Sequence, residues 1–394
     1  MAGSVIVAGA RTPIGKFNGA FASLAAVDLG GAAITAALER AGIRADQVEY
    51  VFMGQVLQAG TGQITARQAA AKAGIPMTTP ATTVNKVCLS GLHSIYLADQ
   101  MIAAGDADIV VAGGMESMTN APYLLPGARH GMRLGDGAVV DSMMFDGLTC
   151  AFDQCAMGEG TERDAADAAI SRQAMDEVAA RSHDLAAGAQ KDGRFEAEIS
   201  PVTIPQRRGE PIVVDRDEGV RPGTTAESLA GLRGAFGGAG NVTAGNASQI
   251  SDGAAAVVLM SKAKAAELGA WPLGEVLGYG QVAGPGTNLL HQPAAAILKA
   301  TDRLGISPAD LDLLEINEAF AAVAHASTAD LGVSPDVVNV DGGAIALGHP
   351  IGASGTRLAL HLLHELGRRG GGLGAAALCG GGGQGDALIV RVDA

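Results

Sequence analysis

An internal repeat restricts this chain to folds that contain two copies of one structural unit. The stretch AAITAALERAGIRADQVEYVFMGQ, which begins at Ala32, matches AAILKATDRLGISPADLDLLEINE, which begins at Ala295, in hydrophobic period and in several identities. One of these identities is a Gly-Ile pair, present at Gly42-Ile43 and at Gly305-Ile306. The sequence therefore predicts two related halves.

A second match concerns two predicted helix starts. Ser90-Gly91 follows Cys88, and Ser354-Gly355 follows a glycine-rich run around His349. Each half thus shows helix, turn and strand, and later strand, turn and helix, which is typical of βα units on a largely parallel sheet. We expect an α/β fold in which the two halves pack together. Cys88 would then meet His349 and Cys379 in one crevice beyond the strand ends.

A segment of different character separates the two halves. The expected division is an N-terminal half at residues 1–118, completed by about 250–270, an inserted loop domain at 119–249, and a C-terminal half at 271–394. The inserted segment contains Pro/Gly punctuation and a helical pattern from Glu159 to about Gln190. It also carries basic side chains suited to a phosphate-bearing ligand. These are Arg129, His130, Arg133, Arg207, Arg208, Arg216 and Arg221.

Composition and charge exclude several classes of protein. With 394 residues, of which 48% are hydrophobic and 17% charged, the chain can bury a large core in two or three domains. The net charge of -14 and the aromatic content of 3% argue against a nucleic-acid surface. No apolar run reaches the roughly 18 residues that cross a bilayer, and the N-terminus lacks a secretory signal. We expect a cytoplasmic protein without a membrane or nucleic-acid partner.

Two of the four cysteines are candidates for covalent chemistry. Cys88, in NKVCLSG, stands where a helical pattern begins, and a helix N-terminus favours a thiolate. Cys379 ends an apolar run and precedes four glycines, which let backbone approach a ligand closely. The alternative is that each thiol is inert core, the usual fate of a free cysteine. Cys150 and Cys155 lack the spacing of a zinc pair, and we interpret them as structural thiols.

The glycine run at Gly380–Gly385 superficially suggests a phosphate-binding loop. A dinucleotide fingerprint requires a helix after the glycines, but the strand-like DALIVRV follows directly. The pattern therefore predicts a strand-turn-strand hairpin rather than a dinucleotide site. The N–H groups of such a turn can point at a carbonyl oxygen, as an oxyanion hole requires.

With these residues identified, the chain resembles the thiolase family over nearly its whole length. Four motifs stand in the family's order: NKVCLSG, the asparagine motif NEAF at Asn317–Phe320, the histidine motif GGAIALGHPIGASG, and CGGGGQG. GNASQISDGAAA and the tetramerisation-loop-like ESMTNAPYLLPGARHGMRLGDG are also similar to those of the short-chain acetoacetyl-CoA type. The resemblance implies two α/β halves with an inserted loop domain.

The resemblance also implies roles for individual residues. Cys88 accepts the acyl group, His349 activates it, and Cys379 removes the α-proton. Asn317 holds a water that, with His349, stabilises one oxygen, and the N–H groups of Cys88 and Gly381 form a second oxyanion hole. Contacts to substrate and coenzyme A are expected from Ser248, Arg221, Met157, Ala244, Ala319 and Phe320.

No metal and no permanently bound cofactor are expected, because coenzyme A serves as substrate and product. Resemblance of the extended loop implies a homotetramer built as a dimer of dimers. The chain departs from the pattern at Ala156, where many short-chain thiolases have histidine, and in the following GEGTERD. This departure bears on the acyl-chain and coenzyme A contacts.

The chemistry of the thiols agrees with a Claisen condensation of two acetyl-CoA molecules and its reversal by thiolysis. A thiolate forms a thioester as reactive as the substrate, and enolate stabilisation must supply much of the barrier lowering. One alternative is a degradative 3-ketoacyl-CoA thiolase for longer or branched chains. Another is a non-catalytic acyl-CoA-binding protein, which would not need both thiols. A decarboxylating ketoacyl synthase would use two histidines with its cysteine.

Overall fold

A computed structural model describes residues 3–236 and 240–394. Residues 1–2 of the predicted N-terminal half and residues 237–239 of the predicted inserted segment lie outside the described residues. The strands are β1 (Ser4–Arg11), β2 (Gly15–Lys16), β3 (Tyr50–Gly54), β4 (Ala81–Val84), β5 (Ile109–Ser117), β6 (Tyr123–Leu124), β7 (Val140–Asp141), β8 (Val202–Ile204), β9 (Ile212–Val214), β10 (Ser251–Ser261), β11 (Gly274–Ala283), β12 (Leu313–Ile316), β13 (Gly372–Gly380) and β14 (Gln384–Val392).

The α-helices are α1 (Ala26–Ala41), α2 (Thr65–Lys72), α3 (Ser90–Ala104), α4 (Met157–Asp167), α5 (Arg172–Lys191), α6 (Ala226–Ala230), α7 (Lys262–Leu268), α8 (Gln292–Leu304), α9 (Ala321–Leu331), α10 (Ala344–Leu347) and α11 (Ser354–Arg368). Short helical segments are η1 (Ala45–Gln47), η2 (Ala128–His130), the π-helical η3 (Met143–Leu148), η4 (Pro308–Asp310) and η5 (Pro335–Val337).

The main sheet is mixed, with the order β12-β13-β14-β11-β1-β10-β5-β3-β4. Pairs β3–β4, β3–β5 and β12–β13 are parallel, whereas β1–β10, β10–β5, β11–β14 and β13–β14 are antiparallel. The α/β class is confirmed, but the prediction of a largely parallel sheet is wrong. In the second half, β14 runs antiparallel to β13 because a tight turn joins them. In the first half, β10 runs antiparallel to β5, and the inserted segment lies between these two strands in the sequence.

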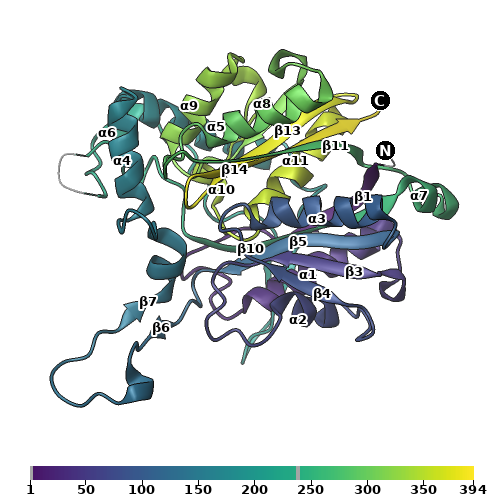
Figure 1. Ribbon diagram of the computed structural model, residues 1–394, viewed down its shortest axis with the longest axis horizontal. Coiled ribbons are helices and arrows are strands. Elements are labelled where there is room, and N and C mark those ends of the chain that lie inside the picture. The colour runs from purple at the N-terminus through teal and green to yellow at the C-terminus, as the bar shows by residue number, and fades with distance from the viewer. Residues whose placement is uncertain (1–2, 237–239) are drawn as a thin grey trace.

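The internal repeat corresponds to a structural repeat. Helix α1, η1 and β3 in the first half match α8, η4 and β12 in the second. Helix α3 matches α11, and these two helices pack against each other between the sheet strands of the two halves (Figure 1). Apolar side chains of this central layer, such as Leu92 and Leu360, are fully buried. The two related halves are thus confirmed.

Glycines allow the starts of α3 and α11 to cross closely. A Cβ atom on Gly91 would lie 2.9 Å from the carbonyl oxygen of Gly352, and one on Gly355 would lie 2.7 Å from the Cβ of Leu92. A Cβ on Gly114 of β5 would also collide with the Gly352 carbonyl oxygen. Thr356 Oγ1 donates to the Gly91 carbonyl at 3.0 Å across the crossing. Backbone therefore packs directly on backbone here.

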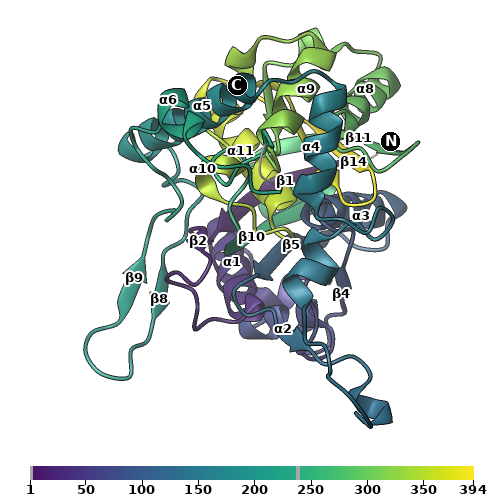
Figure 2. The same ribbon diagram turned by 90° about the vertical axis from the view of Figure 1, so that its left-hand side faces the viewer.

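The inserted segment forms helices on one side of the body and two ribbons that project from it (Figure 2). The predicted continuous helical pattern is two helices, because the chain turns after α4 and Ser171 caps α5 by accepting from the Ala174 N–H at 3.1 Å. The basic residues predicted for a phosphate-bearing ligand do not gather in one patch. Arg129 and Arg133 belong to the β6–β7 ribbon, Arg207 and Arg208 to the β8–β9 ribbon, and Figure 2 shows these ribbons leaving different sides.

A buried ion network joins the inserted segment to both halves. Arg11 of β1 contacts Glu198 at 2.7 Å and Asp217 at 2.7 Å, and His361 of α11 contacts Glu198 at 3.0 Å. Although burial opposes it, Glu198 raises the pKa of His361 to about 9. A buried pair that loses one partner leaves an uncompensated charge, so each member requires the others.

Two further observations apply to the described part of the chain. No helix in it combines the length and the apolar character that a membrane crossing needs. Its His, Cys, Asp and Glu side chains also form no group of three or more that could hold a metal ion.

Replacing Gly355 by alanine tests the helix crossing. The added methyl group cannot fit beside Leu92 without backbone movement, and overpacking of this kind costs about 1–3 kcal/mol. We therefore expect Gly355→Ala to lower the free energy of unfolding in urea by that amount.

The matched control is Gly188→Ala in α5, where a Cβ atom would meet no other atom within 4 Å. Alanine is a better helix former than glycine by up to about 1 kcal/mol, so this variant should be neutral or stabilised. Equal stability of the two variants would contradict a close crossing.

Candidate active site

Side chains from both halves line one small cavity of about 60 Å³. Cys88, His349, Cys379 and Gly381 all border it. Cys88 follows β4, His349 follows α10, and Cys379 is the next-to-last residue of β13. The crevice predicted from the sequence therefore contains both candidate thiols and the histidine.

A tight turn presents Cys88. Val87 has φ of 50°, a left-handed conformation that strains a β-branched residue, and its N–H donates to Asn85 Oδ1 at 3.1 Å. Ser90 Oγ accepts from the Lys86 N–H at 2.8 Å and donates to the Val87 carbonyl at 2.6 Å. These bonds hold the half-buried Cys88 two residues before α3 begins.

An ion pair ties this turn to the other half. Lys86 Nζ lies 2.8 Å from Asp386 of β14, whose carboxylate is fully buried and also accepts from Tyr279 Oη at 2.6 Å. The position of Cys88 therefore depends on a contact between residues 300 apart in sequence.

The glycine turn after Cys379 packs against the Cys88 turn. Strands β13 and β14 form the predicted hairpin, with Cys379 opposite Gly385. A Cβ on Gly380 would lie 2.6 Å from Leu89 Cγ, and one on Gly381 would lie 3.3 Å from Val87 Cγ1. The backbone N–H groups of Gly381 and of Cys88 itself both point to the Cys88 thiol. The oxyanion hole expected from these two N–H groups stays a prediction.

His349 is held by the start of α11. Its Nδ1 lies 2.6 Å from Ser354 Oγ, and that hydroxyl donates to the Pro350 carbonyl at 3.0 Å. Because the amide group Asn317 Nδ2 can only donate and lies beside Nε2, we assign the imidazole proton to Nδ1. Nε2 is then a proton acceptor, and Asn317 Nδ2 lies 3.4 Å from it. Asn317 is fully buried, and its Oδ1 has no protein partner among the described residues.

Two buried carboxylates organise the loops around the cavity. Glu116 accepts from the N–H groups of Val56, Leu57 and Gly352 at 3.0, 3.1 and 3.0 Å, so it fixes the histidine loop to the end of β3. Glu318, the residue after Asn317, accepts from the Ile345 N–H at 3.1 Å. Ile345 belongs to α10, so this bond joins the asparagine motif to the helix that precedes His349. Burial raises the pKa of Glu116 to about 7.

Comparisons with known proteins agree with this geometry. Residues 4–263 match the family described as "Thiolase, N-terminal domain" and residues 270–392 match "Thiolase, C-terminal domain". The chain belongs to the thiolase family.

Close relatives are named acetyl-CoA acetyltransferases. One from Mycolicibacterium smegmatis, named "Probable acetyl-CoA acetyltransferase", is 58% identical over 98% of this thiolase and 100% of its own length. The acetyl-CoA acetyltransferase of Cupriavidus necator is 52% identical over 98% of both chains. The crystal structure of the Bacillus anthracis acetyl-CoA acetyltransferase has a TM-score of 0.96 and 42% identity over 99% of both chains.

Burial keeps the two thiols and the histidine of this cavity uncharged. Burial raises the pKa of Cys88 to about 12, against the opposing effect of the Cys88 and Gly381 N–H groups. Burial also raises the pKa of Cys379 far above its usual range. Burial, assisted by the charge of Arg357, lowers the pKa of His349 to about 3. The expectation of a thiolate at the helix start is therefore wrong for the free protein, because desolvation outweighs the favourable dipoles.

The predicted substrate contacts divide into two groups. Ser248, Met157, Ala319 and Phe320 line the same cavity as the thiols. The Ser248 N–H donates to the Ala319 carbonyl at 3.0 Å, which joins the GNASQ loop to the asparagine motif. Arg221 and Ala244 do not line this cavity and are exposed.

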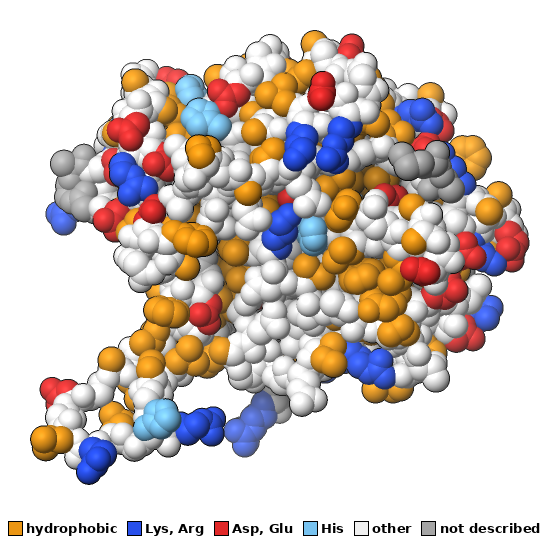
Figure 3. Space-filling view, viewed as in Figure 1, with side chains coloured by type: hydrophobic (Ala, Val, Ile, Leu, Met, Phe, Trp, Pro, Cys, Tyr) orange, Lys and Arg blue, Asp and Glu red, His pale blue; other side chains and the backbone are white. Residues whose placement is uncertain are grey.

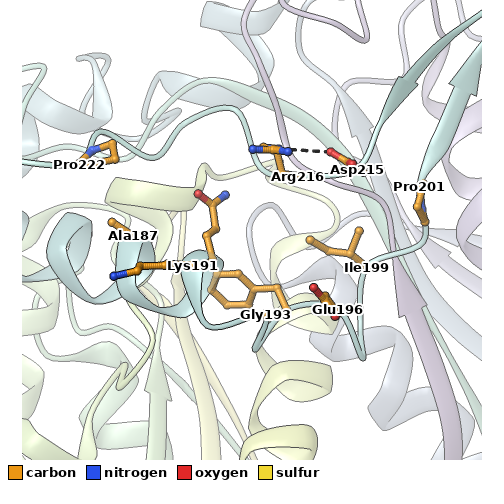
Figure 4. A pocket seen from close by; sticks show the side chains of 11 residues that line it. Ala187, Lys191, Gly193, Glu196, Ile199, Pro201, Asp215, Arg216 and Pro222 are labelled. Carbon is orange, nitrogen blue, oxygen red and sulfur yellow. Dashed lines mark hydrogen bonds and ion pairs between the residues drawn. The ribbon is translucent and has the colours of Figure 1, made fainter.

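A larger cavity of about 540 Å³ lies away from the thiols, between the end of α5 and the chain that carries β8 and β9. Lys191, Glu196 and Arg216 border it, and Arg216 pairs with Asp215 at 3.3 Å (Figure 4). None of the predicted catalytic residues lines this space. Its size alone does not make it the reaction site.

Several supporting residues were not predicted from the sequence. Ser354 was noted only as a helix start, although it contacts His349 Nδ1. Lys86 and Glu116 carried no signal of their own, because a lysine before a cysteine and a lone glutamate are common on protein surfaces. The roles of Lys86 and Glu116 become visible only in the fold, where Lys86 contacts Asp386 and Glu116 contacts Gly352.

The pH dependence of alkylation tests the neutral state of Cys88. Iodoacetamide reacts with the thiolate, so a pKa of about 12 predicts a rate that rises roughly tenfold per pH unit between about pH 7 and about pH 10. The measurement is the rate of Cys88 labelling followed by peptide mass spectrometry. Circular dichroism at each pH checks that the protein stays folded. A rate that levels off near neutral pH would indicate a resting thiolate–imidazolium pair instead.

Proposed function

We propose that this thiolase is an acetyl-CoA C-acetyltransferase that condenses two acetyl-CoA molecules to acetoacetyl-CoA and coenzyme A, and catalyses the reverse thiolysis. The observation that carries the proposal is one small cavity lined by two thiols from different halves and by a neutral histidine. The names of the relatives support the same activity.

In the first step, Cys88 Sγ attacks the acetyl carbonyl while His349 Nε2 takes the thiol proton. A neutral imidazole with a free Nε2 is the form that can accept this proton. The oxygen that gains negative charge is stabilised by donors around it. Coenzyme A leaves as a thiol after taking a proton from Cys379, which is left as a thiolate. The Cys88 and Gly381 N–H groups then hold the thioester oxygen of the acetyl-enzyme.

In the second step, Cys379 removes the α-proton of another acetyl-CoA. The carbanion attacks the acetyl group on Cys88, the carbon–sulfur bond breaks, and the released Cys88 thiolate takes back its proton from His349 Nε2. Because burial raises the pKa of Cys379, its thiolate is a strong base once formed. His349, protonated at Nε2, and Asn317 are suited to stabilise the enolate oxygen.

We also propose which residues contact the rest of the substrate. We assign the pantetheine arm to Ser248 and Met157, and the acyl end to Ala319 and Phe320, because these side chains border the cavity. Arg221 is exposed and is available for a coenzyme A phosphate, and Ala244 is assigned to the same outer region. Coenzyme A is substrate and product, and no permanently bound cofactor is proposed.

The second candidate function is a degradative 3-ketoacyl-CoA thiolase for longer chains. The cavity volume of about 60 Å³ favours a short acyl group over a long one. A series of 3-ketoacyl-CoA substrates of increasing length separates the two, since the proposed enzyme should be fastest with the four-carbon acetoacetyl group.

We also propose a homotetramer, a dimer of dimers, in the cytoplasm. The β6–β7 ribbon supports an assembly role because it exposes apolar side chains along its length, and apolar surface is visible at the lower left of Figure 3. These exposed residues are Tyr123, Leu125, Met132, Leu134 and Val139. The domain division at 1–118, 119–249 and 271–394, with about 250–270 completing the first half, is retained as a proposal.

The variant Cys379→Ser separates the roles of the two thiols. A serine hydroxyl is a much weaker acid than a thiol, so condensation should slow by roughly 10²–10⁴-fold, whereas acetyl transfer to Cys88 needs no carbon acid and should persist. The measurements are single-turnover acetylation and deuterium exchange into the methyl group of acetyl-CoA in heavy water.

Cys155→Ser is the matched control, because Cys155 lines neither the small nor the large cavity, and it should behave as the native protein. If Cys379→Ser exchanges deuterium at the native rate and fails to acetylate, the assignment of the two cysteines is reversed.

A further inference from the structure

The two cysteines outside the catalytic cavity face each other across a short hairpin. Thr149 forms an antiparallel bridge with Ala156, and the next pair inward is Cys150 with Cys155. The Cys150 N–H donates to the Cys155 carbonyl at 2.8 Å, and the Gln154 N–H donates to the Cys150 carbonyl at 2.9 Å. Gln154 has φ of 54°, which turns the chain back after four intervening residues.

This register brings the backbones of the two cysteines together through one ladder bond, while the Cys150 carbonyl accepts from Gln154 rather than from Cys155. Residues directly opposite in an antiparallel pair project their side chains on the same face, and their Cα atoms lie about 5.5 Å apart when the pair is hydrogen-bonded. Disulfides join Cα atoms roughly 4.4–6.8 Å apart. Cys150 and Cys155 are both free thiols, and neither lines the cavity around Cys88.

The surroundings of the two thiols also permit the reaction. Cys155 is half-buried and therefore reachable from solvent, whereas Cys150 is 6% exposed beneath it. Cys150 Sγ accepts from the Asp153 N–H at 3.4 Å, and because a thiol sulfur is a weak acceptor this contact is readily exchanged. Burial and the carboxylates of Glu159 and Asp153 raise the pKa of Cys155, so the reaction is slow at neutral pH and needs sustained oxidant.

We propose that Cys150 and Cys155 form a reversible disulfide, a redox modification site separate from the catalytic thiols. Cys155 attacks an oxidised low-molecular-weight disulfide such as glutathione disulfide, and one glutathione leaves as a thiol. Cys150 then attacks the sulfur of Cys155 in the mixed disulfide, and the second glutathione leaves. Two thiol hydrogens are lost from the protein and appear on the two glutathione molecules, so electrons and protons balance.

The hairpin connects this modification to the catalytic region. Asp153 accepts from Thr287 Oγ1 at 2.6 Å and from Arg163 at 3.0 Å, and a Cβ on Gly382 would lie 3.1 Å from the ring of Phe152. Met157, two residues after Cys155, lines the catalytic cavity. Closing the disulfide removes the hydrogen bond between Cys150 Sγ and the Asp153 N–H. It therefore alters the hairpin whose Phe152 contacts Gly382 in the glycine turn after Cys379.

The test maps the disulfide directly and does not depend on the proposed function. Cys88→Ala protein, which lacks the candidate nucleophile, is incubated with excess glutathione disulfide or with reduced glutathione, and its free thiols are blocked with N-ethylmaleimide. Trypsin releases residues 134–163, a fragment whose only cysteines are Cys150 and Cys155. After oxidation this fragment should carry no label and weigh less by two hydrogen atoms. The native protein is treated in parallel.

A second digestion distinguishes a disulfide from other oxidation. Endoproteinase Asp-N cuts before Asp153, between the two cysteines, so the pieces should stay joined until dithiothreitol is added. In Cys88→Ala with Cys155→Ser the pieces should separate without reductant. The proposal is overturned if the oxidised fragment carries two labels, or if glutathione remains on Cys155 without ring closure.

Discussion

Backbone contact between the two halves is the constraint on which the site depends. Helices α3 and α11 cross at Gly91, Gly352 and Gly355 with no room for a Cβ atom. The Cys88 turn directly precedes α3, and the loop that carries His349 directly precedes α11. Bringing the two helix starts together therefore brings Cys88 and His349 to one cavity, although each belongs to a different copy of the repeat.

Electrostatics then determines how such a cavity can react. Burial keeps Cys88 as a thiol and His349 as a neutral imidazole, so the resting site contains no ion pair. In the proposed mechanism, the negative charge needed for attack forms only during proton transfer to Nε2, beside the Cys88 and Gly381 N–H groups. Ser354 is central to this account, because its hydrogen bond leaves Nε2 free to accept the proton.

Much of the architecture follows from local signals in the sequence. The Gly-Ile repeat predicts the two halves, and the strand-like DALIVRV after the glycines predicts the β13–β14 hairpin. Cys88, His349 and Cys379 stand in motifs, and the structure places all three around one cavity. Their individual roles stay predictions.

Other features depend on contacts that sequence patterns do not carry. Hydrophobic alternation has no direction, so the antiparallel pairing of β10 could not be predicted from it. The contact of Lys86 with Asp386 joins distant segments, and the neutral state of Cys88 results from desolvation by the whole fold rather than from its helix. Composition also could not predict the location of Arg221. A basic residue in an acidic chain reveals its charge, but it does not reveal how far the residue lies from the cavity.

Mass spectrometry after brief exposure to acetyl-CoA tests the central claim most directly. The account predicts one acetyl group on Cys88 of the native protein and none on Cys88→Ala, whose remaining thiols are unchanged. Acetylation of Cys150, Cys155 or Cys379 in place of Cys88 would contradict the account.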